Sequence, residues 1–219
     1  VGLDDCLFNA DWLDKTRERA EAAAVNHRDY GTLGYTLGDE CYVDAFTKGG
    51  RFSAGEPVWQ EFREYLKTIY EGSLERLNSQ WETAFPSWDE VKFASDGELL
   101  RSFENPSPWT DFRMFTAHIF TRRFRALRDR LRELHPGAAV GWDGCEEYSS
   151  YDGIDWWEFT RDMEINVVYA GSTLGGSSGA TNRTFNSQAV KSFNPDAPLS
   201  GAFMNSIDYR YGAEHSTWG

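Results

Sequence analysis

Cysteine is scarce in this chain, and the three that occur, Cys6, Cys41 and Cys145, are widely spaced. They form no CxxC pair, so the sequence supports neither a disulfide framework nor a zinc motif. No apolar run approaches the roughly 20 residues of a membrane-spanning helix. Basic residues are also outnumbered, with 22 Lys and Arg against 35 Asp and Glu and a formal net charge of −13. This balance argues against nucleic acid and anionic membranes as partners, because both require a basic face.

A glycine-rich phosphate loop is missing as well. Residues 171–176 are rich in glycine and serine but do not lead from a strand into a helix, as a nucleotide-binding loop must. We therefore expect no dinucleotide fold, no cofactor and no metal.

Aromatic residues, in contrast, make up 16% of the chain and include nine Trp. Packing in the core explains most of them. The alternative for some is a cleft that binds sugars, because sugar rings present apolar C–H faces that stack on aromatic rings.

The chain starts at Val1 without an initiator Met or a signal-like segment. We expect residues 1–219 to be one partial domain of a longer protein, truncated at both ends. Location in the cytoplasm or outside the cell stays open.

Hydrophobic spacing and turn residues divide the chain into alternating helices and strands. Helices are predicted over residues 11–26, 57–70, 74–81, 111–135 and 154–161, and strands over 33–38, 138–142, 164–169 and 199–205. Loops are predicted over 82–108 and 171–194. This order is typical of an α/β fold with parallel strands and crossover helices. A (β/α)8 TIM barrel fits but needs about 250 residues, so only part of one would be present.

The helix predicted over residues 111–135 carries a run of arginines opposite its apolar stripe. They are Arg122, Arg123, Arg125, Arg128, Arg130 and Arg132. We expect them mostly to face water rather than to form a binding patch.

The segment 35–42 is the first candidate for chemistry. A short apolar strand ends there in two adjacent carboxylates, Asp39 and Glu40. Charge at the mouth of a buried strand costs free energy unless it is paired or used, and barrels carry their active sites at such strand ends. Glu40 is therefore our candidate acid/base, with a surface glutamate or an ion pair as the alternative.

The middle of the chain carries many aromatic, leucine and polar residues in a specific spacing. In residues 62–91 they are Phe62, Tyr65, Leu66, Tyr70, Ser73, Leu74, Leu77, Asn78, Trp81, Thr83 and Phe85. Asp111, Phe112 and Phe115 follow at the start of the next long helix. Both segments resemble glycoside hydrolase family 42 β-galactosidases, and the resemblance extends over roughly residues 35–169.

The resemblance implies a clan A (β/α)8 barrel with two catalytic carboxylates, in which the visible strands are the fourth to the seventh. Glu40 corresponds to the family's acid/base. The family's nucleophile is a Glu at the end of the seventh strand, but residues 199–208 contain no Glu. Asp208 is the nearest carboxylate and is assigned this role, with Glu214 next. The alternative for Asp208 is a turn-forming role after the strand.

Two further departures concern the surroundings of Glu40. The family usually has Asn before its acid/base residue, where this chain has Asp39. Many members also carry a cysteine cluster that binds zinc, but only Cys41 is present here. We therefore expect no zinc at this position.

Residues at other strand ends are candidates for binding substrate. Asp39 and Asp143 could bind sugar hydroxyls, and helix or loop caps are the alternatives. Trp142 and Tyr169 could stack on a sugar ring, or could equally be core residues. Asn205, at the end of the last strand, completes this set.

We therefore predict a retaining, β-galactosidase-like glycoside hydrolase that cleaves O-glycosidic bonds of an oligo- or polysaccharide. The alternative, motivated by the missing Glu, is a non-catalytic carbohydrate-binding protein on a degenerate hydrolase barrel. A homo-oligomer of the full-length protein stays open. Taken alone, a half-barrel would expose strand edges, so we expect the 219-residue segment to be unstable by itself.

Overall fold

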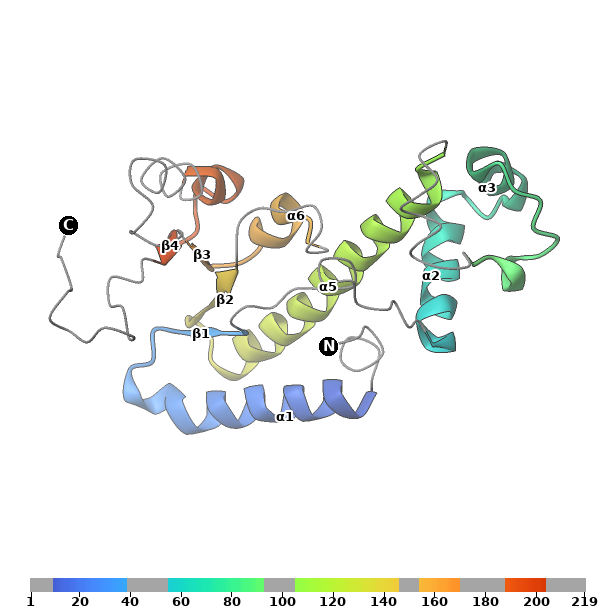
Figure 1. Cartoon of the computed structure of the whole chain (residues 1–219). Helices are drawn as coiled ribbons and strands as arrows, with labels where there is room; N and C mark the ends of the chain where they lie inside the picture. Colours follow the sequence, from blue (N-terminus) through green and yellow to red (C-terminus); the bar gives the residue numbers. More distant parts are fainter. Residues whose placement is uncertain (1–9, 39–54, 93–104, 146–153, 170–187, 204–219) are drawn as a thin grey trace, which may run out of the picture. The chain divides into compact units, whose positions relative to one another are not determined.

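The computed structural model describes residues 10–38, 55–92, 105–145, 154–169 and 188–203 (Figure 1). The chain divides into two compact units. The first unit comprises Val1–Thr16, Val43–Arg123 and Ser150–Asp155, and the second comprises Arg17–Tyr42, Phe124–Ser149 and Trp156–Gly219. No helix in the described part of the chain is long and apolar enough to cross a membrane.

The second unit is built on a parallel sheet in the order β1-β2-β3-β4. The strands are β1 (Gly34–Thr36), β2 (Ala139–Cys145), β3 (Ile165–Tyr169) and β4 (Leu199–Phe203). All three pairings are parallel. The four predicted strands and the parallel α/β class are therefore confirmed, with boundaries that shift by at most three residues.

Three helices cover one face of this sheet. Val140 and Trp142 lie two residues apart in β2 and therefore face the same side. Val140 packs with Ala24 of α1 (Ala10–His27) and Leu131 of α5 (Ser107–Leu134). Trp142 packs against α6 (Trp156–Thr160), where the rings of Trp156 and Phe159 lie 5.1 and 5.5 Å from its own.

Glycines let the first three strands approach closely. A Cβ on Gly141 would lie 1.9 Å from the carbonyl oxygen of Ile165, and one on Gly34 would lie 2.8 Å from Ile165 Cδ1. Gly141 and Ile165 are also register partners. The backbone of Ile165 thus occupies the space of a Cβ on Gly141, and its side chain lies where a Cβ on Gly34 would be.

The first unit contains α2 (Glu56–Ile69), α3 (Leu74–Trp81) and the greater part of α5. Pro57 lies in the first turn of α2, where its missing N–H is not needed. Ser73 caps α3 by accepting a hydrogen bond from the Arg76 N–H at 3.2 Å, which confirms the predicted cap. α5 begins four residues earlier than predicted, with Pro108 in its first turn.

Aromatic rings form the core of this unit. Phe62 is fully buried, and its ring centroid lies 5.2 Å from Phe112 and 5.1 Å from Phe115 of α5. Trp81 of α3 stacks on the same ring at 6.2 Å. The unusual aromatic content therefore serves packing here, because each ring buries a large apolar area.

The polar positions of the same segment hold the helices together. Asp111 Oδ2 accepts hydrogen bonds from the Tyr70 hydroxyl at 2.6 Å and from Trp81 Nε1 at 2.7 Å. Asn78 donates to the Phe85 carbonyl and accepts from the Phe85 N–H, both at 2.9 Å. Three helices and the turn after α3 are thereby joined through two side chains.

The two predicted loops contain short helical turns. Within 82–108, Trp88–Glu90 forms a 3-10 helix, and Val91 after it is fully buried. Within 171–194, residues 188–193 are helical, which is a correction to the loop predicted there. Val190, which is buried, and Phe193 are the two large apolar side chains among these six residues. Their hydrophobic periodicity therefore indicated a helix only weakly.

We expect Gly141→Ala to lower the free energy of unfolding by about 3 kcal/mol or more, because β2 and β3 must separate to admit the methyl group. Urea denaturation of the full-length protein measures this. Gly31→Ala is the control. Gly31 has φ 72° but no atom within 4 Å of the added Cβ, so only about 1 kcal/mol of backbone strain is expected. Equal losses in both variants would refute the packing argument.

Burial, and next the hydrogen bond to Asp111, raise the pKa of Tyr70 above its ordinary value of 10.0. A raised pKa favours the protonated phenol in the folded state. Its contribution to stability is therefore complete below pH 10 and is lost as the pH rises further. We expect the wild-type protein to lose more unfolding free energy than Tyr70→Phe between pH 9 and about 11. Parallel losses in urea denaturation at these pH values would contradict this linkage.

Candidate active site

The carboxyl ends of the four parallel strands meet at one edge of the sheet. Leu37 N–H continues the ladder beyond β1 by donating to the Gly141 carbonyl at 2.7 Å. At the other side of the sheet, Tyr169 at the end of β3 pairs with Phe203 at the end of β4. Active sites of α/β barrels lie at this edge.

The predicted carboxylates follow the two outer strands of this sheet. Asp39 and Glu40 come after β1, and Asn205 and Asp208 come after β4. All four residues, like Cys41, lie outside the described residues. The structure thus brings their strands into one sheet with two strands between them.

Asp143 lies where the pairing of β2 with β3 is irregular. Trp142 pairs with Asn166 and Cys145 with Val168, so β2 has one residue more than β3 between these positions. Such bulges occur preferentially at sheet edges and next to active sites. The side chains of Asp143 and Tyr169 lie outside the described part of the chain.

Trp142 is placed in the core. Its exposed fraction is 1%, and its indole Nε1 donates to Asn166 Oδ1 at 3.2 Å. With its ring packed against Trp156 and Phe159, its described contacts are those of a core residue. This is the second of the two interpretations that the sequence allowed.

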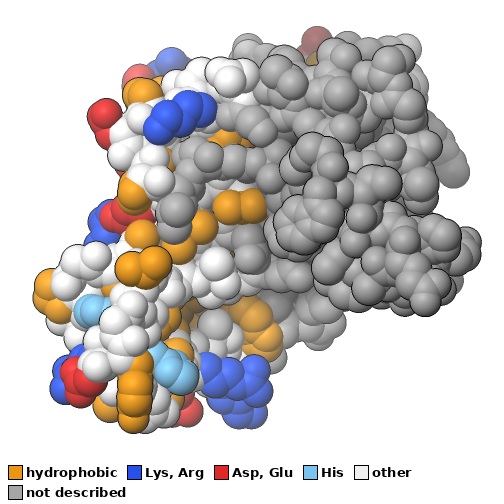
Figure 2. All heavy atoms as spheres, turned by 90° about the vertical axis from the view of Figure 1, so that its left-hand side faces the viewer, with side chains coloured by type: hydrophobic (Ala, Val, Ile, Leu, Met, Phe, Trp, Pro, Cys, Tyr) orange, Lys and Arg blue, Asp and Glu red, His pale blue; other side chains and the backbone are white. Residues whose placement is uncertain are grey.

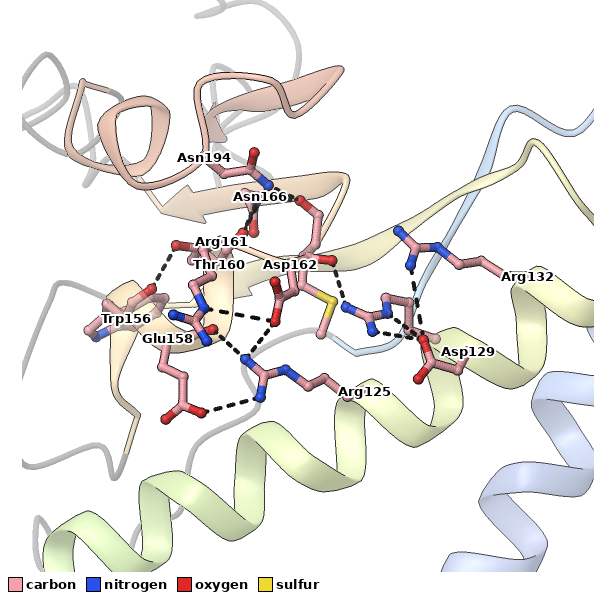
Figure 3. A network of polar contacts seen from close by, with 12 residues as sticks. Arg125, Asp129, Arg132, Trp156, Glu158, Thr160, Arg161, Asp162, Asn166 and Asn194 are labelled. Carbon is pink, nitrogen blue, oxygen red and sulfur yellow. Dashed lines mark hydrogen bonds and ion pairs between the residues drawn. The ribbon is translucent and has the colours of Figure 1, made fainter.

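Asn166 is a structurally important position that the sequence interpretation missed. It is fully buried in β3, and its Nδ2 donates to the carbonyls of Thr160 and Met163 at 3.1 and 2.8 Å. Asn194 donates to the same two carbonyls at 3.2 and 2.8 Å (Figure 3). The signal was an asparagine inside an otherwise apolar strand, because a buried amide needs partners.

The arginines of α5 correct the prediction that most of them face water. Arg125 binds both Glu158 Oε1 at 3.2 Å and Asp162 Oδ2 at 2.6 Å (Figure 3). The side chain of Arg128 is only 11% exposed. Arg132 forms an ion pair with Glu164, and burial, followed by the nearby Arg128, lowers its pKa. The remaining three also pair with carboxylates: Arg122 and Arg123 with Glu61, and Arg130 with Glu21 and Glu133.

These ion pairs have a structural role in the second unit. Glu164 both pairs with Arg132 and accepts a hydrogen bond from the Val140 N–H at 3.0 Å. Arg125 and Arg128 both contact Asp162 in the turn between α6 and β3. The charged face of the helix therefore fixes the amino ends of β2 and β3. No group of three or more His, Cys, Asp or Glu that could hold a metal ion occurs among the described residues.

Comparison with known proteins gives a family. A family model for the β-galactosidases of glycoside hydrolase family 42 matches residues 44–199. The β-galactosidase Pbg of Clostridium perfringens is 28% identical over 116 residues, which are 50% of this chain and 16% of Pbg.

Solved structures agree in fold. The cold-adapted β-galactosidase of Rahnella sp. R3 matches with a TM-score of 0.69 at 14% identity, over 98% of this chain and 31% of that one. A catalytic mutant of Gan42B, a β-galactosidase of G. stearothermophilus, matches with a TM-score of 0.64 at 17% identity, over 86% of this chain and 28% of that one. These likenesses identify the described sheet and helices as part of a TIM barrel.

The extent of the family match is informative for the site. Trp142, Asp143 and Tyr169 lie within the matched residues, whereas Glu40 and Asp208 lie outside them. The chain spans 16% of the curated relative's length. Since the match nevertheless covers well over half of its residues, this chain belongs to glycoside hydrolase family 42, the β-galactosidase family.

Proposed function

We propose that the protein of which this chain is part is a retaining glycosidase that hydrolyses β-galactosides. Glu40 is the acid/base, Asp208 is the nucleophile, and the described strands are the fourth to the seventh of the barrel. One observation carries the proposal. In a chain of this family, β1 and β4 lie in one parallel sheet, and the two candidate carboxylates follow their carboxyl ends.

Exposed apolar side chains support a larger barrel around this sheet. Hydrophobic side chains reach the surface among charged ones on the face drawn in Figure 2. Among the described large hydrophobic residues, the largest exposed fractions are 83% for Tyr30 and 84% for Leu33, which lie in the four residues before β1. Within the described sheet, β1 is an outer strand. Apolar residues this exposed beside a strand edge favour further strands and helices that cover them.

The proposed reaction has two steps. In the first, Glu40 donates its proton to the glycosidic oxygen while the Asp208 carboxylate attacks the anomeric carbon, and the sugar–oxygen bond breaks. In the second, the ionised Glu40 removes a proton from water, and the water oxygen displaces Asp208 from the anomeric carbon. Asp39, Asp143, Tyr169 and Asn205 are proposed to bind the hydroxyls and faces of the sugar.

A separate observation favours a second candidate function. Residues 199–208 contain no Glu, so the nucleophile position of the family is not filled in the expected way. A carbohydrate-binding protein without hydrolytic activity is the alternative. Calorimetric binding of galacto-oligosaccharides, combined with no turnover on a panel of aryl glycosides, would favour it.

We expect Glu40→Gln in the full-length protein to lower kcat/KM for an aryl β-galactoside by about 10²–10⁴-fold, because the amide can neither donate nor accept the transferred proton. Turnover is measured by release of the aryl alcohol. Glu64→Gln is the matched control, because Glu64 lies on the surface and pairs only with Lys67 among the described residues. Unchanged turnover by Glu40→Gln would end the assignment.

Trp142→Phe separates a core role from a binding role. We expect it to lower the free energy of unfolding by about 1–3 kcal/mol, since Asn166 Oδ1 loses its buried donor. KM for the aryl galactoside should remain unchanged. A clear rise in KM without loss of stability in urea denaturation would instead return Trp142 to the substrate site.

A further inference from the structure

Trp157 is exposed on a helix whose other aromatic residues are buried. In α6, the exposed fractions are 8% for Trp156 and 1% for Phe159, but 54% for Trp157. The guanidinium carbon of Arg161 lies 4.6 Å from the centroid of the Trp157 ring. Since Trp157 remains half exposed with Arg161 in this position, the arginine covers only part of the indole and leaves an open apolar surface beside a cation.

The backbone that carries this pair is held firmly. Thr160 of α6 is fully buried, and its carbonyl accepts hydrogen bonds from both Asn166 and Asn194 (Figure 3). Arg125 binds the side chain and the carbonyl of Glu158. A helix fixed at these points presents its exposed indole without the entropy loss of ordering a flexible segment.

Arg161 has hydrogen-bonding capacity available. Its side chain is 41% exposed, and its Nε lies 3.9 Å from Asp162 Oδ2, which is already engaged by Arg125 at 2.6 Å. Within the described part of the chain, its terminal nitrogens make no hydrogen bond. A guanidinium in this state can donate to hydroxyl oxygens next to the ring.

Local charge and size indicate the kind of ligand. Arg125 and Arg161 are balanced by Glu158 and Asp162, so the surroundings favour a neutral molecule. The exposed apolar surface is that of a single indole, which is the size of one sugar ring. Apolar C–H bonds that stack on the ring and hydroxyls that accept from Arg161 are both offered by a hexose.

We propose that Trp157 and Arg161 form a binding site for a neutral saccharide, separate from the proposed active site. Arg161 follows α6 and directly precedes the turn into the amino end of β3. It therefore lies at the end of the sheet opposite to the carboxyl edge that Glu40 follows. The site would retain a polysaccharide near the enzyme without contact with the reacting bond. The saccharide class rests on the proposed function.

Calorimetry with a thio-linked β-1,4-galactotetraose tests this site, because the probe is not hydrolysed whichever residue is catalytic. We expect the full-length protein to bind the probe in two events, and Trp157→Ala to weaken one of them by about tenfold or more. Trp12→Ala is the control for loss of an exposed indole, because Trp12 is 41% exposed, and it should leave both events unchanged. An isotherm of Trp157→Ala that superimposes on that of the wild type overturns the proposal.

Two further variants keep the test independent of folding and of the active site. Trp157→Phe should retain part of the weakened event, and Arg161→Met should weaken it while keeping the stem that packs on the indole. If Trp157→Ala fails to fold, the isotherms of these two variants decide in its place. Aryl β-galactoside turnover should be unchanged in all of them. If Glu40→Gln leaves turnover intact, the proposed catalytic role of Glu40 is refuted. The calorimetry of the Trp157 variants still decides whether saccharide binds at Trp157, because it does not depend on turnover.

Discussion

Parallel pairing is the constraint on which the rest of this structure depends. Two parallel strands cannot be joined by a tight turn, so each pair needs a crossover that returns the chain to the same end of the sheet. Between β1 and β2 the crossover contains α2, α3 and α5, and between β2 and β3 it contains α6. The same constraint gathers all carboxyl ends at one edge. The distribution of helices and the place of the candidate chemistry thus have one cause.

The residues by which the family is recognised are mostly structural. Tyr70 and Trp81 are far from Asp111 in sequence, but both donate to the same carboxylate oxygen of Asp111. Asn78 closes the turn after α3 through its amide. Each of these side chains has a specific partner at a fixed geometry, so a substitution would leave a partly buried polar group unsatisfied. Such requirements explain why this segment is distinctive although it carries none of the proposed catalytic groups.

The sequence was sufficient to predict elements whose signal is local. Ser73 as a cap, Pro57 in the first turn and the apolar stripe of α5 each depend on neighbours within a few residues, and the strands follow from short apolar runs. Contacts between distant residues were not predictable. The buried amide of Asn166 and the pairing of Arg132 with Glu164 are decided by which elements become neighbours in the fold. For the site, the strands that lead to Glu40 and Asp208 were predicted correctly, whereas the roles of these two carboxylates stay predictions.

The position of β1 and β4 determines what the proposed chemistry requires of the rest of the barrel. Neighbouring strands lie about 4.8 Å apart, so strands three places apart would be separated by about 14 Å in a flat sheet. A retaining pair of carboxyl groups must approach to about 5–5.5 Å. The sheet must therefore curve so that the ends of its outer strands turn toward each other. Gly34 and Gly141 permit the close approach of β1, β2 and β3 over Ile165. Asp208 is one methylene shorter than the family's Glu, so the curvature of the sheet must bring the two strand ends closer than a glutamate pair would need.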